Sequence, residues 1–92
     1  MRLFFTASFL KASKKLHPSQ KTKLDIALKT ISADPSLGEA KVGDLSGIRV
    51  YKFRVSQEIF LLAYRILNED SIKLLTFGPH ENFYRDLKRK DN

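Results

Sequence analysis

The sequence of 92 residues contains no cysteine and no tryptophan, one methionine, four glycines and three prolines. The absence of cysteine excludes disulfides and thiolate metal sites, so packing alone must hold the fold. The longest apolar run, Ile59 to Tyr64, is far shorter than the roughly 20 residues of a membrane-spanning helix. The N-terminus lacks the charged and apolar blocks of a signal peptide. We therefore expect a cytoplasmic protein with no membrane span.

Acidic residues are also scarce, with ten Asp and Glu against seventeen Lys and Arg, a formal net charge of +7. Such a balance favours contact with polyanions, and nucleic acid, an acidic protein and an anionic membrane surface are all candidates. The length predicts a single domain over residues 1–92. A domain of this size buries a small core, so a bound partner would add substantially to its stability.

The first half of the chain predicts a short strand and two helices. Arg2 to Phe5 is an apolar opening, and Thr6 can cap a helix that runs to His17. Pro18 suits the first turn of a second helix, which ends at Asp34-Pro35 because the residue before a proline is pushed out of the helical region. Its predicted buried stripe is Leu24, Ala27, Leu28 and Ile31. The segment from Pro35 to Gly47 is predicted to be a loop.

The second half predicts three strands that form an antiparallel meander, followed by a helix. From Ile48 to Val55 apolar and basic residues alternate, which indicates a half-buried strand. The run from Ile59 to Leu67 is apolar on both faces and is placed centrally. Ile72 to Phe77 follows a turn, and a helix is expected from His80 or Glu81 to about Lys90. With the first strand rejoining the sheet by a crossover, the predicted class is α+β, with a mainly antiparallel four-stranded sheet in the order β-α-α-β-β-β-α.

Lys52 and Arg54 are the first candidates for chemistry. Two residues apart on a strand, they project from one face about 7 Å apart, close to the spacing of successive phosphates in a nucleic acid. The alternative is an ordinary solvated strand face.

His80, Glu81 and Tyr84 form the second candidate group. An i, i+4 step on a helix would place the imidazole of His80 and the phenol of Tyr84 on one side. Imidazole can transfer protons near neutral pH, and a tyrosine can hold a phosphate or a nucleophile in line. The alternative is helix capping by His80 and Glu81 with Tyr84 in the core. We expect neither a metal nor another cofactor, because the other histidine, His17, is distant and no carboxylate recurs at ligand spacing.

Further basic residues are candidates for RNA or phosphate binding. Arg65 lies among apolar neighbours on its strand and needs either a carboxylate partner or an anion. Arg49 begins the basic strand and is a candidate for the same role. The lysines of the two helices are interpreted as a solubilising face, because they lack the interleaved aromatics of a stacking platform. They are Lys11, Lys14, Lys15, Lys21, Lys23 and Lys29.

The element order and three motifs together resemble the RelE/ParE superfamily of bacterial toxins over nearly the whole chain. The motifs are Leu45-Ser46-Gly47, Tyr51-Lys52-Phe53-Arg54-Val55 and Gly78-Pro79-His80-Glu81-Asn82-Phe83-Tyr84. The resemblance implies the toxin of a type II toxin-antitoxin system that inhibits growth and is neutralised by a cognate antitoxin. RelE-like members cut mRNA on the ribosome without a metal, and ParE-like members inhibit DNA gyrase.

The same resemblance implies roles for individual residues. Lys52 and Arg54 match the basic strand residues that hold the phosphate in RelE-like nucleases. His80 matches their basic or acid/base residue, and Tyr84 matches their C-terminal tyrosine. Leu61 departs from the pattern, because the family usually has an arginine there that contacts the scissile phosphate.

Three hypotheses follow. The first is a ribosome-dependent mRNA endonuclease that uses Lys52, Arg54, His80 and Tyr84. The second is a ParE-like gyrase inhibitor that docks through the C-terminal helix and its basic end, Lys88 to Lys90, and cleaves no bond. The third is a toxin-like binding module without enzymatic activity. The four retained positions favour the first hypothesis, and Leu61 favours the other two.

Overall fold

The computed structural model describes residues 1–81 and 83–90, without the side chains of Asp86 and of residues 88–90. Asn82 of the C-terminal motif and the basic side chains from Lys88 to Lys90 therefore lie outside the described residues. The elements are β1 (Arg2–Phe5), α1 (Ala7–Ser13), α2 (Pro18–Ala33), the 3-10 turn η1 (Pro35–Leu37), β2 (Glu39–Ala40), the 3-10 turn η2 (Gly43–Leu45), β3 (Arg49–Val55), β4 (Glu58–Asn68), β5 (Ser71–Pro79) and α3 (Phe83–Lys90).

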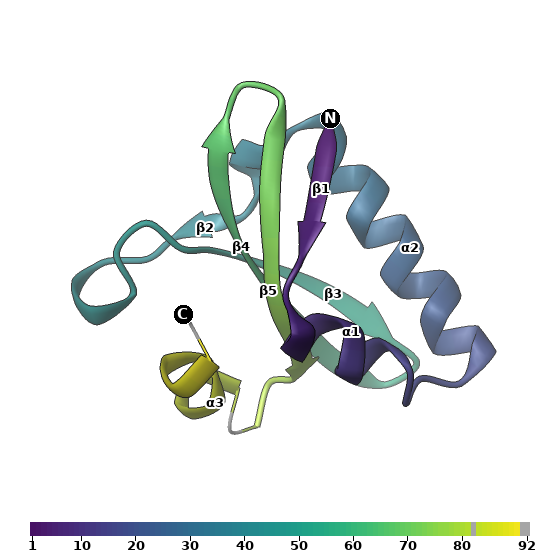
Figure 1. Cartoon of the computed structure of the whole chain (residues 1–92). Coiled ribbons are helices and arrows are strands. Elements are labelled where there is room, and N and C mark those ends of the chain that lie inside the picture. The colour runs from purple at the N-terminus through teal and green to yellow at the C-terminus, as the bar shows by residue number, and fades with distance from the viewer. Residues whose placement is uncertain (82, 91–92) are drawn as a thin grey trace.

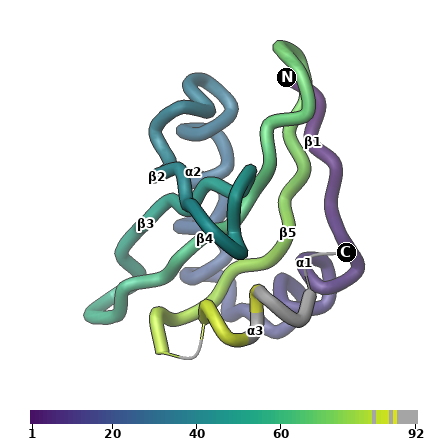
Figure 2. The backbone as a smooth tube through the Cα atoms, turned by 90° about the vertical axis from the view of Figure 1, so that its left-hand side faces the viewer, coloured from purple at the N-terminus to yellow at the C-terminus, as the bar shows by residue number. Residues whose placement is uncertain are grey.

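Within the described residues the strands form one sheet in the order β1-β5-β4-β3-β2 (Figure 1). β3, β4 and β5 make the predicted antiparallel meander, with β4 in the centre. β1 lies beside β5 and runs parallel to it, which confirms that the first strand rejoins the sheet by a crossover (Figure 2). The α+β class is confirmed, and the order of the predicted elements is preserved.

Helices cover both faces of the sheet. α1 and α2 pack on one face, where the predicted α2 stripe is confirmed by buried Leu24, Ala27 and Ile31. α3 packs on the other face through Phe83 and Leu87, and lies near the end of β5 (Figure 2). In the described part of the chain, no helix is long and apolar enough to cross a membrane.

Two predictions about local structure are wrong. α1 ends at Ser13 and not at His17, because after Ser13 the backbone bonds tighten to i, i+3 steps, from Lys15 N to Ala12 O and from Leu16 N to Ser13 O. The predicted loop after α2 contains β2, which pairs with the start of β3 and makes the sheet five-stranded in the described residues, where four strands were predicted. A strand of two residues has no alternation that a sequence pattern could reveal.

The Tyr64 hydroxyl fixes the segment between α2 and β2 against the sheet. Tyr64 is fully buried; its hydroxyl accepts a hydrogen bond from Gly38 N at 3.0 Å and donates one to Pro35 O. Burial raises the pKa of this phenol, so it stays neutral at physiological pH. A Cβ added to Gly38 would overlap the Tyr64 hydroxyl, so glycine is required there. This anchor determines where the chain enters β2.

We expect Tyr64→Phe to destabilise the protein by about 2 kcal/mol, because it leaves the buried Gly38 amide and the partly buried Pro35 carbonyl without their partner. For a domain of this size the melting temperature should fall by roughly 10 °C. Thermal unfolding followed by circular dichroism measures the change. Tyr51→Phe is the matched control, because the Tyr51 hydroxyl makes no hydrogen bond within the described residues. Equal melting temperatures for the two variants would refute the role of the anchor.

Candidate functional site

Lys52 and Arg54 lie on the face of β3 that also carries Val50, which packs in the core beneath α3. Both side chains are exposed, as predicted, and neither has an ion pair or a side-chain hydrogen bond in the described part of the chain. Tyr51 and Phe53 project to the opposite face, where their rings stack 6.5 Å apart. The alternation of β3 therefore leaves two cations available to an anion on the α3 face.

His80 and Tyr84 are brought together, although not by the predicted helical step. α3 begins at Phe83, so His80 precedes the helix, and its backbone amide still bonds to the neighbouring strand through Ile59 O at 3.0 Å. The two rings meet edge to face with centroids 6.3 Å apart. Tyr84 is half-buried and His80 is exposed, so the imidazole remains accessible from solvent.

Strand register places His80 level with the basic strand. Arg54 pairs with Ile59 of β4, and Ile59 O accepts the His80 amide. Two strand spacings separate the backbones of Arg54 and His80, about 10 Å. The last strand does not adjoin Lys52 and Arg54 directly, because β4 lies between β3 and β5. The long Lys and Arg side chains can nevertheless reach an anion held in front of β4.

Lys41 joins this cluster, and sequence analysis missed it. Its ammonium lies 5.2 Å from the centroid of the Tyr84 ring and 3.1 Å from a Glu39 carboxylate oxygen. The Tyr84 phenol beside the ammonium raises the pKa of Lys41, so the amine is cationic at neutral pH. Lys41 follows β2 in the segment predicted as a loop, and no local pattern connects it with a tyrosine so distant in the chain.

Arg49 and Arg65 do not join the cluster. Arg49 occupies an odd position of β3, and its Nη1 donates to Ser36 O and Gly38 O at 3.2 and 2.7 Å, which supports the segment after α2. Arg65 lies six residues beyond Ile59 on β4, about 20 Å along the strand. Its Nη1 approaches Ser46 O at 3.4 Å. The structure therefore assigns these two arginines to other parts of the sheet.

Leu61 is fully buried on the α3 face. It pairs across the strands with Lys52 and packs in the same core as Phe83 and Leu87. Leu61, the position at which RelE-like nucleases usually have an arginine, is therefore part of the apolar surface on which α3 packs. No group of three or more His, Cys, Asp or Glu side chains suited to a metal ion occurs among the described residues.

The family model of the ParE-like toxin of type II bacterial toxin-antitoxin systems matches residues 3–88. The chain belongs to this family. This match confirms the resemblance to the RelE/ParE superfamily. No curated protein sequence matches the chain.

Solved structures of E. coli RelE share the fold of this ParE-like toxin. A RelE double mutant in the free state has a TM-score of 0.72 at 19% identity, covering 96% of this chain and 90% of that one. The isolated RelE toxin gives 0.67 at 22% identity, covering 95% of each chain. RelE in the intact RelBE toxin-antitoxin complex gives 0.69 at 22% identity, covering 86% of this chain and 95% of that one. At these identities the likeness concerns the fold and assigns no residue a role.

Proposed function

We propose that this ParE-like toxin is a metal-independent endoribonuclease that cuts mRNA on the ribosome and is neutralised by a cognate antitoxin. The observation that carries the proposal is that exposed Lys52 and Arg54 lie on the α3 face of the sheet, with Arg54 level with His80, and that the Tyr84 ring contacts both His80 and Lys41. Solved structures of E. coli RelE with its antitoxin RelB support the antitoxin partner. The proposed targets place the protein in the cytoplasm.

In the proposed reaction, a ribose 2′-hydroxyl attacks the adjacent phosphorus. A bond forms between the 2′-oxygen and phosphorus, and the bond from phosphorus to the 5′-oxygen breaks, leaving a cyclic phosphate and a free 5′-hydroxyl. Lys52 and Arg54 stabilise the negative charge that develops on the phosphate oxygens. The 2′-hydroxyl loses a proton and the departing 5′-oxygen gains one, and His80 accepts the first as general base or donates the second as general acid. Tyr84 positions the phosphate, and the Lys41 ammonium against the Tyr84 ring adds positive charge beside it.

Inhibition of DNA gyrase is the second candidate function, and the burial of Leu61 favours it. Where RelE-like nucleases carry an arginine toward the scissile phosphate, this chain has an aliphatic side chain with no exposed surface. For a nuclease, losing a charge-assisted donor there would cost roughly 3 kcal/mol of transition-state stabilisation. A protein that acts by docking does not need that donor.

We expect His80→Ala and Tyr84→Phe each to slow ribosome-dependent mRNA cleavage by about 10- to 1000-fold, the range of a lost proton-transfer or positioning group. Binding to the ribosome should change little. His17→Ala and Tyr51→Phe are matched controls, since His17 is exposed at the start of α2 and Tyr51 lies on the opposite face of the sheet. Cleavage products are resolved by primer extension on programmed ribosomes.

A parallel supercoiling assay with purified gyrase separates the two functions. Gyrase inhibition predicts that His80→Ala and Tyr84→Phe remain inhibitory, while a chain truncated after Leu87 loses inhibition. Truncation at this point keeps Leu87, a buried side chain through which α3 packs on the sheet. Inhibition of supercoiling by the wild type, with no mRNA cleavage, would overturn the nuclease proposal.

A further inference from the structure

A groove of about 380 Å³ lies on the face of the sheet opposite to Lys52 and Arg54. One wall is α1 and the turn after it, and the other is formed by the end of β5 at Gly78 and Pro79. Its floor is apolar, with Ala12, Leu16, Phe60 and Phe77. The volume is within the range of pockets that hold a ligand group or a side chain, and the groove is open to solvent.

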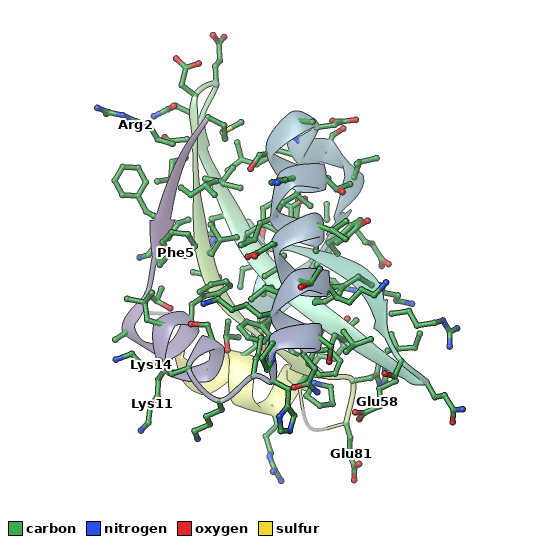
Figure 3. The ribbon with its side chains drawn as sticks, turned by 90° about the vertical axis from the view of Figure 1, so that its right-hand side faces the viewer. Arg2, Phe5, Lys11, Lys14, Glu58 and Glu81 are labelled. Atoms are coloured by element: carbon green, nitrogen blue, oxygen red, sulfur yellow. The ribbon has the colours of Figure 1, made fainter. Side chains whose placement is uncertain are left out.

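The rim of the groove is cationic. Lys11 of α1 and Lys15 of the turn after it both line the groove and both are exposed, and its lining among the described residues includes no acidic side chain. Lys14 projects from the same end of α1 (Figure 3). An occupant must therefore combine an apolar group for the floor with negative charge for the rim.

The floor favours a protein over a nucleic acid. Phe60 and Phe77 are only 5% and 7% exposed, so they present small apolar patches and no ring face on which a base could stack. An amphipathic acidic segment, with one large apolar side chain in the groove and carboxylates at the lysines, matches both features. Gly78 leaves room for such a side chain, since a Cβ built on it meets no atom within 4 Å.

The groove adjoins the segment that carries His80. Gly78 and Pro79 line the groove and directly precede His80. A second hollow, of about 160 Å³, shares Gly78 and Pro79 with the groove and extends to Glu81 and Phe83, the first residue of α3. Figure 3 shows Glu81 at the same end of the molecule as Lys11 and Lys14. An occupant would thus contact the chain on which the candidate site is built without covering the basic strand.

We propose that this groove, defined by Lys11, Lys15, Phe60, Phe77 and Gly78-Pro79, is a docking surface for an acidic amphipathic segment of the cognate antitoxin. The inference rests on the proposed function for the identity of the partner. In this groove the antitoxin segment lies on the face of the sheet opposite to Lys52 and Arg54. It contacts the end of β5, which leads directly into His80. Carboxylates pair with the two lysines, and one apolar side chain fills the groove.

The test uses the full-length chain and the protein encoded by the open reading frame adjacent to its gene. Lys11→Glu with Lys15→Glu should weaken binding at least tenfold by isothermal titration calorimetry, and more at low salt than at high salt. Ser8→Phe, which narrows the groove without a charge change, should also weaken binding at least tenfold. Lys21→Glu with Lys23→Glu on α2 is the matched control, because both lysines are exposed and outside the groove. Circular dichroism establishes that each variant is folded.

Undiminished binding by folded Lys11→Glu, Lys15→Glu and Ser8→Phe proteins would overturn the inference. If these variants instead bind normally but lose mRNA crosslinking and growth arrest, the groove serves nucleic acid, which also overturns it. The proposed function fails separately. A wild-type chain that binds the neighbouring protein through the groove and cleaves no mRNA leaves the docking surface standing and the nuclease proposal refuted.

Discussion

Replacing both Lys52 and Arg54 by alanine should abolish growth arrest and leave the fold intact. The two side chains are exposed and make no ion pair within the described residues, so their removal breaks no structural contact. If they hold the scissile phosphate, the loss of two charged donors should lower the rate of mRNA cleavage by about 1000-fold or more. The measurement is single-turnover cleavage on programmed ribosomes, alongside growth after induction.

The control for this prediction must reproduce the change in net charge. Lys21→Ala with Lys23→Ala removes two exposed cations from α2, on the opposite side of the molecule from the α3 face. This control should keep its activity, because a diffuse attraction to the ribosome weakens only slightly when two of seventeen cations are lost. A folded Lys52→Ala and Arg54→Ala protein that still arrests growth fully would show that the basic strand is dispensable, and would direct attention to α3 and gyrase.

Local patterns in the sequence predicted the elements that are amphipathic along their length. The alternation in β3 correctly placed Lys52 and Arg54 on the solvent side, and the apolar run of β4 correctly indicated a central strand. The α2 stripe and the cap at Thr6, whose side chain accepts from Phe9 N, follow the same local logic. These features depend on neighbours a few residues apart, so one sequence is enough to reveal them.

Features that depend on distant parts of the chain were not predicted. Lys41 meets Tyr84 only because β2 pairs with β3 and α3 folds back over the sheet. Arg49 was a candidate for phosphate binding, but the fold turns it toward the carbonyls of Ser36 and Gly38. His80 was placed on a helix, but its backbone remains bonded to Ile59. In each case the deciding contact is tertiary, and a periodic pattern carries no information about it.

Leu61 shows how packing can oppose a substitution that a family pattern would suggest. Replacing Leu61 by arginine would restore the usual residue of RelE-like nucleases. Leu61, however, has no exposed surface and packs against Phe83 and Leu87 of α3. A guanidinium at this position loses its hydration without gaining a carboxylate partner on that apolar surface. The aliphatic packing of Leu61 is lost as well.

We therefore expect Leu61→Arg to destabilise the fold by about 4 kcal/mol or more, the sum of a lost core side chain and an unpaired buried charge. This is a large share of the roughly 5–15 kcal/mol that stabilises a typical domain, so the variant should be partly unfolded at 37 °C. Urea denaturation measures the loss, with Leu61→Met as a volume-conserving control that should cost less than about 1.5 kcal/mol. A Leu61→Arg protein that is as stable as the wild type and cleaves mRNA faster would show that α3 leaves its seat in the active molecule. Position 61 would then face the phosphate as the family pattern implies, and the burial of Leu61 would no longer favour gyrase.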